Sequence, residues 1–145
     1  MKTRLCSINL SVRDYSTKDT GSFSYHGEVV VIDYDLKQYD FRFYNTDSGT
    51  LAVSIDCSKD VIKVIEQSET VNLIMGLKVD EFHQCVYRFD ENNRLELLTR
   101  AWDLVVEDNH IMFEYDLYDK NDVNHDRPLT KNTVRIDFEG ESKVC

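Results

Sequence analysis

The chain has 145 residues and a formal net charge of −10, from 27 acidic and 17 basic residues. This length suits one domain with a single core, spanning residues 1–145. Nucleic acid is not an expected partner because the basic residues are sparse and phosphates need a basic patch. A membrane is not expected either, because no apolar run approaches the roughly 20 residues of a spanning helix.

The four cysteines, Cys6, Cys57, Cys85 and Cys145, are far apart and form no C-x-x-C pair. Zinc sites need clustered ligands, and secreted disulfide scaffolds carry denser cysteine. The N-terminal residues alternate between apolar and polar, unlike the continuous apolar core of a signal peptide. We therefore expect reduced thiols in a cytoplasmic protein, with no metal and no cofactor.

Alternating apolar residues predict two strands in the N-terminal part of the chain. Residues 5–12 place Cys6, Ile8, Leu10 and Val12 on one side, the pattern of a half-buried strand. Residues 23–34 form a second predicted strand, and Gly27 inside it predicts a bulge or a bend at the corner of a barrel.

Two hairpins are predicted next, from residues 39–45 with 51–57 and from residues 61–66 with 71–79. The Asp47-Ser48-Gly49 turn pairs Phe43 with Val53 and Phe41 with Ile55, while a turn at Ser68-Glu69 pairs Val64 with Leu73 and Ile62 with Met75. Both registers place apolar residues opposite apolar residues. No segment shows a convincing helical repeat.

Residues 83–89, 95–106 and 111–117 read as three consecutive antiparallel strands, and the last strand covers residues 133–138. Turns at Asn92-Asn93 and Asp108-Asn109 set the register of the three strands. Side chains alternate between faces, so one face holds Leu104 opposite Phe113, Trp102 opposite Tyr115 and Arg100 opposite Leu117. The first turn adds Tyr87 opposite Leu98, Cys85 opposite Arg100 and His83 opposite Trp102.

The number and spacing of the strands predict an all-β domain. We expect a single closed or nearly closed antiparallel β-barrel with eight to ten strands in a meander. Closure is favoured over a sandwich because the hairpins follow one another without interruption and a closed sheet has no exposed edges.

An arginine on the apolar face is the strongest candidate for chemistry. A buried guanidinium is costly to desolvate unless it is paired, and it matches a carboxylate or phosphate through two parallel hydrogen bonds. The predicted interior ligand site has Arg100 as the anion anchor, with these residues around it: Trp102, Tyr115, Phe113, Leu104, Tyr87, Cys85 and His83. The alternative is an arginine at a strand end that reaches water or pairs with an acidic residue.

Other reactive groups give weaker signals. The histidines are scattered, and none has metal-ligand spacing. His83 and Cys85 share a predicted face, so a thiol–imidazole pair is conceivable, although no oxyanion hole or orienting carboxylate accompanies it. The loop of residues 119–126 is rich in Asp and Asn but lacks the EF-hand pattern, so we expect a solvated loop without calcium.

The order of several short segments resembles that of the YwiB-like bacterial proteins, a group of small calycin-like barrels of unestablished function. The segments are Glu69-Thr70-Val71, Cys85-Val86-Tyr87, Leu97-Leu98-Thr99 and Glu114-Tyr115-Asp116-Leu117. The resemblance implies a cytoplasmic closed barrel and brings no catalytic residues with it.

Two functions remain open from the sequence. The first is a non-enzymatic barrel that binds a small amphipathic or anionic molecule in its interior. The second is a protein-interaction module that uses its acidic surface or an exposed apolar patch including Val30, Ile32 and Val105. An enzyme is the less expected third reading, and the oligomeric state is left open.

Overall fold

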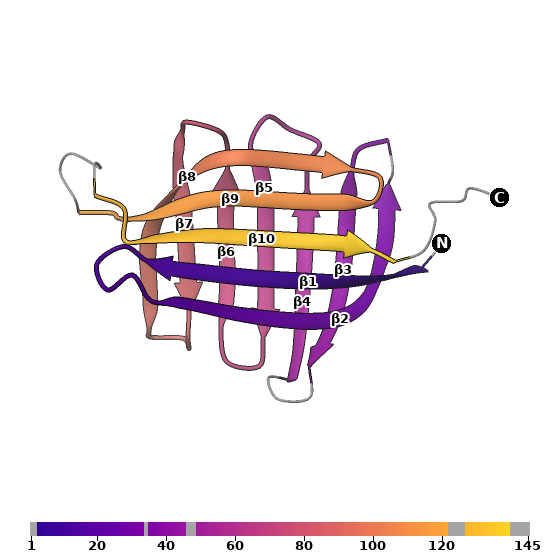
Figure 1. Ribbon diagram of the computed structural model, residues 1–145, viewed down its shortest axis with the longest axis horizontal. Helices are drawn as coiled ribbons and strands as arrows, with labels where there is room; N and C mark the ends of the chain where they lie inside the picture. Colours follow the sequence, from indigo (N-terminus) through magenta and orange to yellow (C-terminus); the bar gives the residue numbers. More distant parts are fainter. Residues whose placement is uncertain (1–2, 34, 46–48, 122–126, 140–145) are drawn as a thin grey trace.

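The computed structural model describes residues 3–33, 35–45, 49–121 and 127–139. Ten strands follow one another (Figure 1), and no helix among the described residues is long and apolar enough to cross a membrane. The strands are β1 (Thr3–Asp14), β2 (Thr20–Asp33), β3 (Gln38–Asn45), β4 (Gly49–Asp56), β5 (Ile62–Ser68), β6 (Asn72–Leu77), β7 (Phe82–Arg88), β8 (Arg94–Glu107), β9 (His110–Asp119) and β10 (Thr130–Phe138).

The strands form a closed antiparallel barrel in which each strand pairs with its neighbours in the chain. Closure comes from β1 and β10, which pair from Cys6 opposite Phe138 to Asp14 opposite Thr130. Because the sheet closes on itself, neither terminal strand presents an unpaired edge. The expected closed barrel with a meander order is confirmed.

The barrel consists of two sets of strands that cross steeply. In Figure 1, β1, β8, β9 and β10 run across the front, and β3 to β7 run from top to bottom behind them. The two strands of 14 residues, β2 and β8, turn from one set to the other. Orthogonal packing of this kind needs bends or bulges at the corners.

Each corner strand has a residue that permits its bend. At Gly27 of β2, an added Cβ would lie 1.9 Å from the carbonyl oxygen of Arg42 and 2.7 Å from Cα of Phe43. Only glycine allows β3 to approach this closely. In β8 the register with β9 shifts between Ala101 and Asp103, which makes Trp102 the extra residue of a β-bulge. The prediction of a corner at Gly27 agrees with this close approach.

Part of the barrel core is packed with aromatic rings. The ring of Phe41 stacks on those of Tyr39, Phe43 and Phe138, with centroids 6.0, 5.5 and 6.0 Å apart. Ile8, Ile136, Phe113 and Ile111 are fully buried in the same core. This packing, rather than an empty lumen, holds the two sets of strands together.

Buried Thr99 joins three strands where the β6–β7 ladder ends. The last β6–β7 pair is Met75 opposite Cys85. Beyond it, the Thr99 hydroxyl of β8 donates to the carbonyl oxygen of Gly76, 2.5 Å away, and lies 3.3 Å from that of His83. The hydroxyl therefore takes the place of ladder bonds that the separating strands do not make.

The expected register was correct near one turn and wrong near another. Val106 lies opposite Ile111 and Leu104 opposite Phe113, as predicted. Between β7 and β8, however, Tyr87 lies opposite Leu95, not Leu98. The cause is a longer turn, in which the Asp90 carboxylate accepts hydrogen bonds from the backbone N–H groups of Asn92 and Asn93, at 2.8 and 2.9 Å.

The registers of the two earlier hairpins differ from prediction without changing the faces. Phe43 lies opposite Leu51 rather than Val53, and Val64 lies opposite Met75 rather than Leu73. A displacement by two residues preserves the side on which a side chain lies. The predicted apolar faces of these hairpins are therefore the buried ones.

Candidate ligand-binding site

The predicted anion anchor does not lie inside the barrel. Ala101 rather than Trp102 lies opposite Tyr115, and Trp102 is 61% exposed. The Arg100 side chain, 42% exposed, lies on the outer surface, 3.8 Å from Asp80 and 5.4 Å above the ring of Phe82. The interior placement of Arg100 and Trp102 was wrong because the bulge reverses the alternation of side chains in β8.

The predicted neighbours His83 and Cys85 are not brought together. Cys85 is fully buried in the core, whereas His83 lines a groove on the outer surface with Val61 and Gly76. Burial raises the pKa of the Cys85 thiol to about 12, so it is protonated and a poor nucleophile at neutral pH. The conceivable thiol–imidazole pair therefore has no geometric basis.

The remaining predicted site residues do face the barrel interior. Cys85, Phe113 and Tyr115 are buried, and Tyr87 and Leu104 pack partly buried against the same core. Their burial is consistent with the predicted interior face. Their predicted contact with a ligand stays a prediction.

An acidic residue that the sequence reasoning overlooked also faces the interior. Glu66 of β5 lies opposite Leu73 of β6 and opposite Val53 of β4, both buried core residues. The signal was present in the sequence, because Glu66 continues the alternation of Ile62 and Val64. A carboxyl group in such surroundings is unusual and marks a candidate functional position.

Glu66 belongs to an interior group of ionisable side chains with Cys85, Tyr87 and Tyr115. Desolvation raises the pKa of Glu66 to about 7. Burial is the main cause that raises the pKa of Tyr87 and of Tyr115. Repulsion between the ionised phenol and the negative charges of Glu66 and Cys85 raises both pKa values further. The interior therefore holds hydroxyl groups that stay neutral beside one carboxyl group that changes charge near neutral pH.

We call the end of the barrel where this group lies the open end, because interior-facing side chains are accessible to solvent there. The turns β1–β2, β5–β6 and β7–β8 lie along the left and lower edges of Figure 1 and surround this end. Three apolar residues whose register assigns them to the interior face remain accessible there: Val12 at 37%, Phe23 at 53% and Leu95 at 47%. The inward-facing residues Glu66 and Tyr87 are half-buried, so solvent still reaches part of each side chain.

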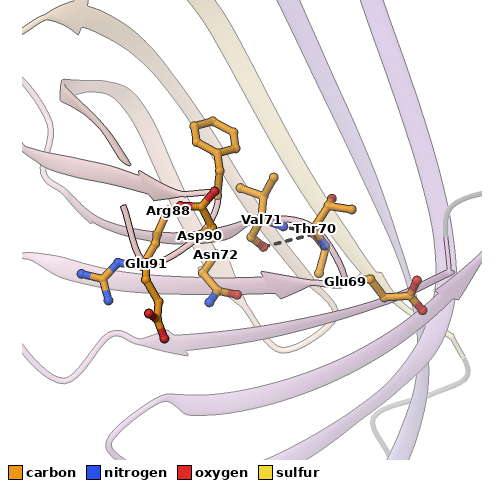
Figure 2. A pocket seen from close by; sticks show the side chains of 9 residues that line it. Glu69, Thr70, Val71, Asn72, Arg88, Asp90 and Glu91 are labelled. Carbon is orange, nitrogen blue, oxygen red and sulfur yellow. Dashed lines mark hydrogen bonds between the residues drawn. The ribbon is translucent and has the colours of Figure 1, made fainter. Parts of the chain in front are cut away.

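A cavity of about 330 Å³ lies on the rim of this end, between the β5–β6 and β7–β8 turns. Figure 2 shows Asn72, Arg88 and Glu91 on one side of it and Glu69 at the far end. The Ser68 hydroxyl and the backbone of Val71 fix the first turn, with a Val71 N–H to Ser68 Oγ distance of 3.0 Å. The rim is therefore polar, whereas the interior behind it is mostly apolar.

The open end combines apolar walls with a few convergent polar groups. This combination is typical of small-molecule sites, in which apolar surface supplies binding energy and polar groups set orientation. A carboxyl group and two phenols can hydrogen-bond an alcohol or an amine, and the ionised carboxylate can attract a cation. An anion is disfavoured here because Glu66 would repel it.

These features define a closed antiparallel β-barrel with one accessible end. No protein-family model matches the chain, and no curated protein matches it. Among solved structures, the fold is similar to that of the ywiB protein from Bacillus subtilis, with a TM-score of 0.64 and 14% sequence identity over 95% of this chain and 94% of that one. At this identity the similarity shows a YwiB-like fold and transfers no site.

Proposed function

We propose that this protein is a non-enzymatic barrel that binds a small amphipathic molecule at its open end. The observation that carries the proposal is the half-buried Glu66, which faces the interior beside Tyr87 and Tyr115 instead of water. Keeping a carboxyl group there costs folding free energy. A ligand that hydrogen-bonds this group would offset that cost.

The chemistry of the ligand follows from the same residues. Its polar group is an amine or a hydroxyl, because these complement a carboxyl group and two phenols. Its apolar part contacts the accessible interior-facing side chains of Leu95 and Tyr87. Of the two ligand classes expected from the sequence, the amphipathic one keeps its support, and the anionic one loses its anchor at Arg100.

The cysteines support a cytoplasmic location as part of the proposal. In the described part of the chain, Cys6, Cys57 and Cys85 are all free. Burial raises the pKa of Cys6 to about 12 and that of Cys57 to about 11. Thiols in this state are compatible with a reducing compartment.

The test uses three probes that share a six-carbon chain: hexylamine, hexanol and hexanoate. Each is titrated into labelled protein while the backbone amide shifts are followed by NMR. We expect hexylamine and hexanol to shift the amides of Glu66, Tyr87 and Leu95. Binding of hexylamine should strengthen between pH 6 and pH 8, because the Glu66 carboxyl, with its pKa of about 7, becomes ionised while the amine stays protonated.

Glu66→Gln tests the role of the carboxyl group, and Glu114→Gln on β9 is the control that removes one negative charge elsewhere. We expect the first variant to lose the pH dependence of hexylamine binding and the second to keep it. Native mass spectrometry of the purified protein adds a search for a co-purified molecule. The proposal fails if neither probe shifts amides at the open end and no bound molecule is found.

A further inference from the structure

The outer surface carries a second hollow, which is separate from the open end. It is a groove of about 540 Å³ over β5, β6 and β7. The floor is Gly76, whose neighbours Met75 and Leu77 point into the core, so Gly76 faces outward. An added Cβ at Gly76 would lie 3.1 Å from Val61 and 3.2 Å from His83, which form the walls. A side chain at residue 76 would therefore narrow the groove.

One end of the groove is apolar. Ile74, 50% exposed, lies opposite Ile65 of β5 and opposite Val86 of β7. These three side chains make an apolar row across three strands of the outer surface. Such a row is unusual on the outer face of a barrel that also has a buried core.

The other end of the groove carries two lysines and one aspartate, Asp56. Lys63 lies opposite Gly76, and Lys59 is also part of the lining. Among the described residues, no carboxylate forms an ion pair within 4.0 Å with either lysine. The chain as a whole is acidic, with 27 acidic and 17 basic residues.

Asp56, the acidic residue in the groove lining, accepts hydrogen bonds within its own turn. Asp56 lies opposite Lys63 across the β4–β5 ladder, but its Oδ1 accepts hydrogen bonds from the backbone N–H and the hydroxyl of Ser58, at 2.9 and 2.6 Å. These bonds are the main cause that lowers the pKa of Asp56. Attraction to the Lys59 charge lowers the pKa of Asp56 a little further. Because the turn occupies this carboxylate and it forms no ion pair with either lysine, both ammonium groups can still contact an external anion.

We infer that this groove binds a small amphipathic anion, whose acidic group contacts Lys59 and Lys63 and whose apolar part lies on Ile74 and Val86. The length of the groove limits the ligand. Ile74 and Gly76 are two residues apart on one strand, about 6.6 Å, so a short aliphatic or aromatic acid fits. The inference does not depend on the site at the open end, which has the opposite charge preference.

The same three six-carbon probes separate the two sites. Hexanoate should shift the amides of Ile74, Gly76, His83 and Val86, and hexylamine should not. Acetate, which has the charge but no tail, should bind more weakly than hexanoate, as should hexanol, which has the tail but no charge. Because the lysines are exposed, binding should weaken as salt is added.

Lys63→Gln and Lys59→Gln should each weaken hexanoate binding about two- to fivefold, the range for one exposed ion pair. Arg13→Gln, which removes an exposed cation from β1 on another wall, is the matched control and should leave it unchanged. Gly76→Ala should reduce binding by narrowing the groove. The thermal unfolding of Gly76→Ala is measured alongside its binding. If this variant unfolds, the two lysine variants, which leave the floor intact, still test whether hexanoate binds in the groove.

Three outcomes would overturn the inference. They are hexanoate shifts that fall at the open end, hexanoate binding equal to that of acetate, and Lys63→Gln and Lys59→Gln proteins that bind like Arg13→Gln. The site at the open end would fail separately, through the Glu66→Gln comparison with hexylamine.

Discussion

Ala101 lies opposite Tyr115 across the β8–β9 ladder, and the next residue, Trp102, has no partner on β9 and is 61% exposed. The extra residue bends β8 from one set of strands to the other. It also brings Leu104 and Val106 back to the interior beyond the bend. The bulge therefore serves the closure of the barrel and leaves the one tryptophan of the chain outside it.

The fluorescence of Trp102 can test whether its side chain is exposed. We expect its fluorescence to resemble that of a tryptophan in water and to be quenched readily by iodide. Trp102→Ala should lower the free energy of unfolding by less than about 1 kcal/mol, whereas Phe113→Ala, at a fully buried position, should cost about 3–5 kcal/mol. Urea denaturation measures both values. Emission shifted to the blue, with protection from iodide, would place Trp102 inside and contradict the register.

Gly27 and Gly21 form a matched pair in β2. Gly27→Ala should destabilise the protein by at least about 2 kcal/mol, because the new Cβ would overlap the backbone of Arg42 and Phe43. Gly21→Ala should change the stability by no more than about 1 kcal/mol, because the nearest atom would be 4.0 Å away. Equal effects of the two substitutions in urea denaturation would show that β2 has no tight corner at Gly27.

Thr99→Val should cost about 1–3 kcal/mol, because it leaves the carbonyl oxygen of Gly76 without its donor. Thr50→Val, at an exposed position on β4, is the control and should change stability by about 0.5 kcal/mol or less. Amide hydrogen exchange gives a second measurement, in which faster exchange around β6 and β7 is expected only for Thr99→Val. No difference between the variants would mean that the hydroxyl does not join these strands.

Glu66 makes stability depend on pH. Its pKa rises from 4.5 to about 7 on folding, so the folded chain binds more protons than the unfolded chain within this window. The free energy of unfolding should therefore fall as pH rises from about 4.5 to about 7. Glu66→Gln removes this contribution, and its stability relative to the native protein should increase across the window.

The size of this effect is limited because the Glu66 side chain is only half-buried. We expect Glu66→Gln to be more stable than the native protein by on the order of 2 kcal/mol at pH 8 and equally stable at pH 4. Thermal unfolding across this pH range measures the difference. A constant difference at all pH values would show that the carboxyl group titrates normally.

The buried thiols should resist alkylation. Burial raises the pKa of Cys6 and Cys85 to about 12 in each case, which leaves little thiolate at pH 8. Iodoacetamide should therefore label neither residue in the native protein and both in urea, as peptide mass spectrometry would show. Rapid labelling of Cys85 in the native state would mean that the interior opens more widely than its burial indicates.

The faces of the strands were more predictable than their pairing. Alternation in β3 to β6 identified the buried residues even though Phe43 and Val64 have other partners than expected. An error of two residues is harmless because the side-chain period is two. The bulge at Trp102 and the turn stabilised by Asp90 each displace the register by an odd number of residues, and such errors reverse a face.

The site was less predictable for the same reason. Arg100 was placed inside by counting from two turns. One count missed the unpaired Trp102, and the other missed the longer turn between β7 and β8. Glu66, in contrast, lies on a regular strand whose alternation assigns it to the interior. The groove at Gly76 depends on side chains from three strands, so it becomes visible only when their register is known.

The ladder between β1 and β10 joins the first and last strands of the fold, with Cys6 opposite Phe138. During synthesis, therefore, the ring can close only after the residues of β10 have left the ribosome. Until then, β1 and β9 each offer a row of free backbone groups to any neighbouring chain. Once the last ladder forms, the backbone groups of both strands are hydrogen-bonded at the same moment. The protein then has neither of the two exposed strand edges at which another chain could add and start aggregation.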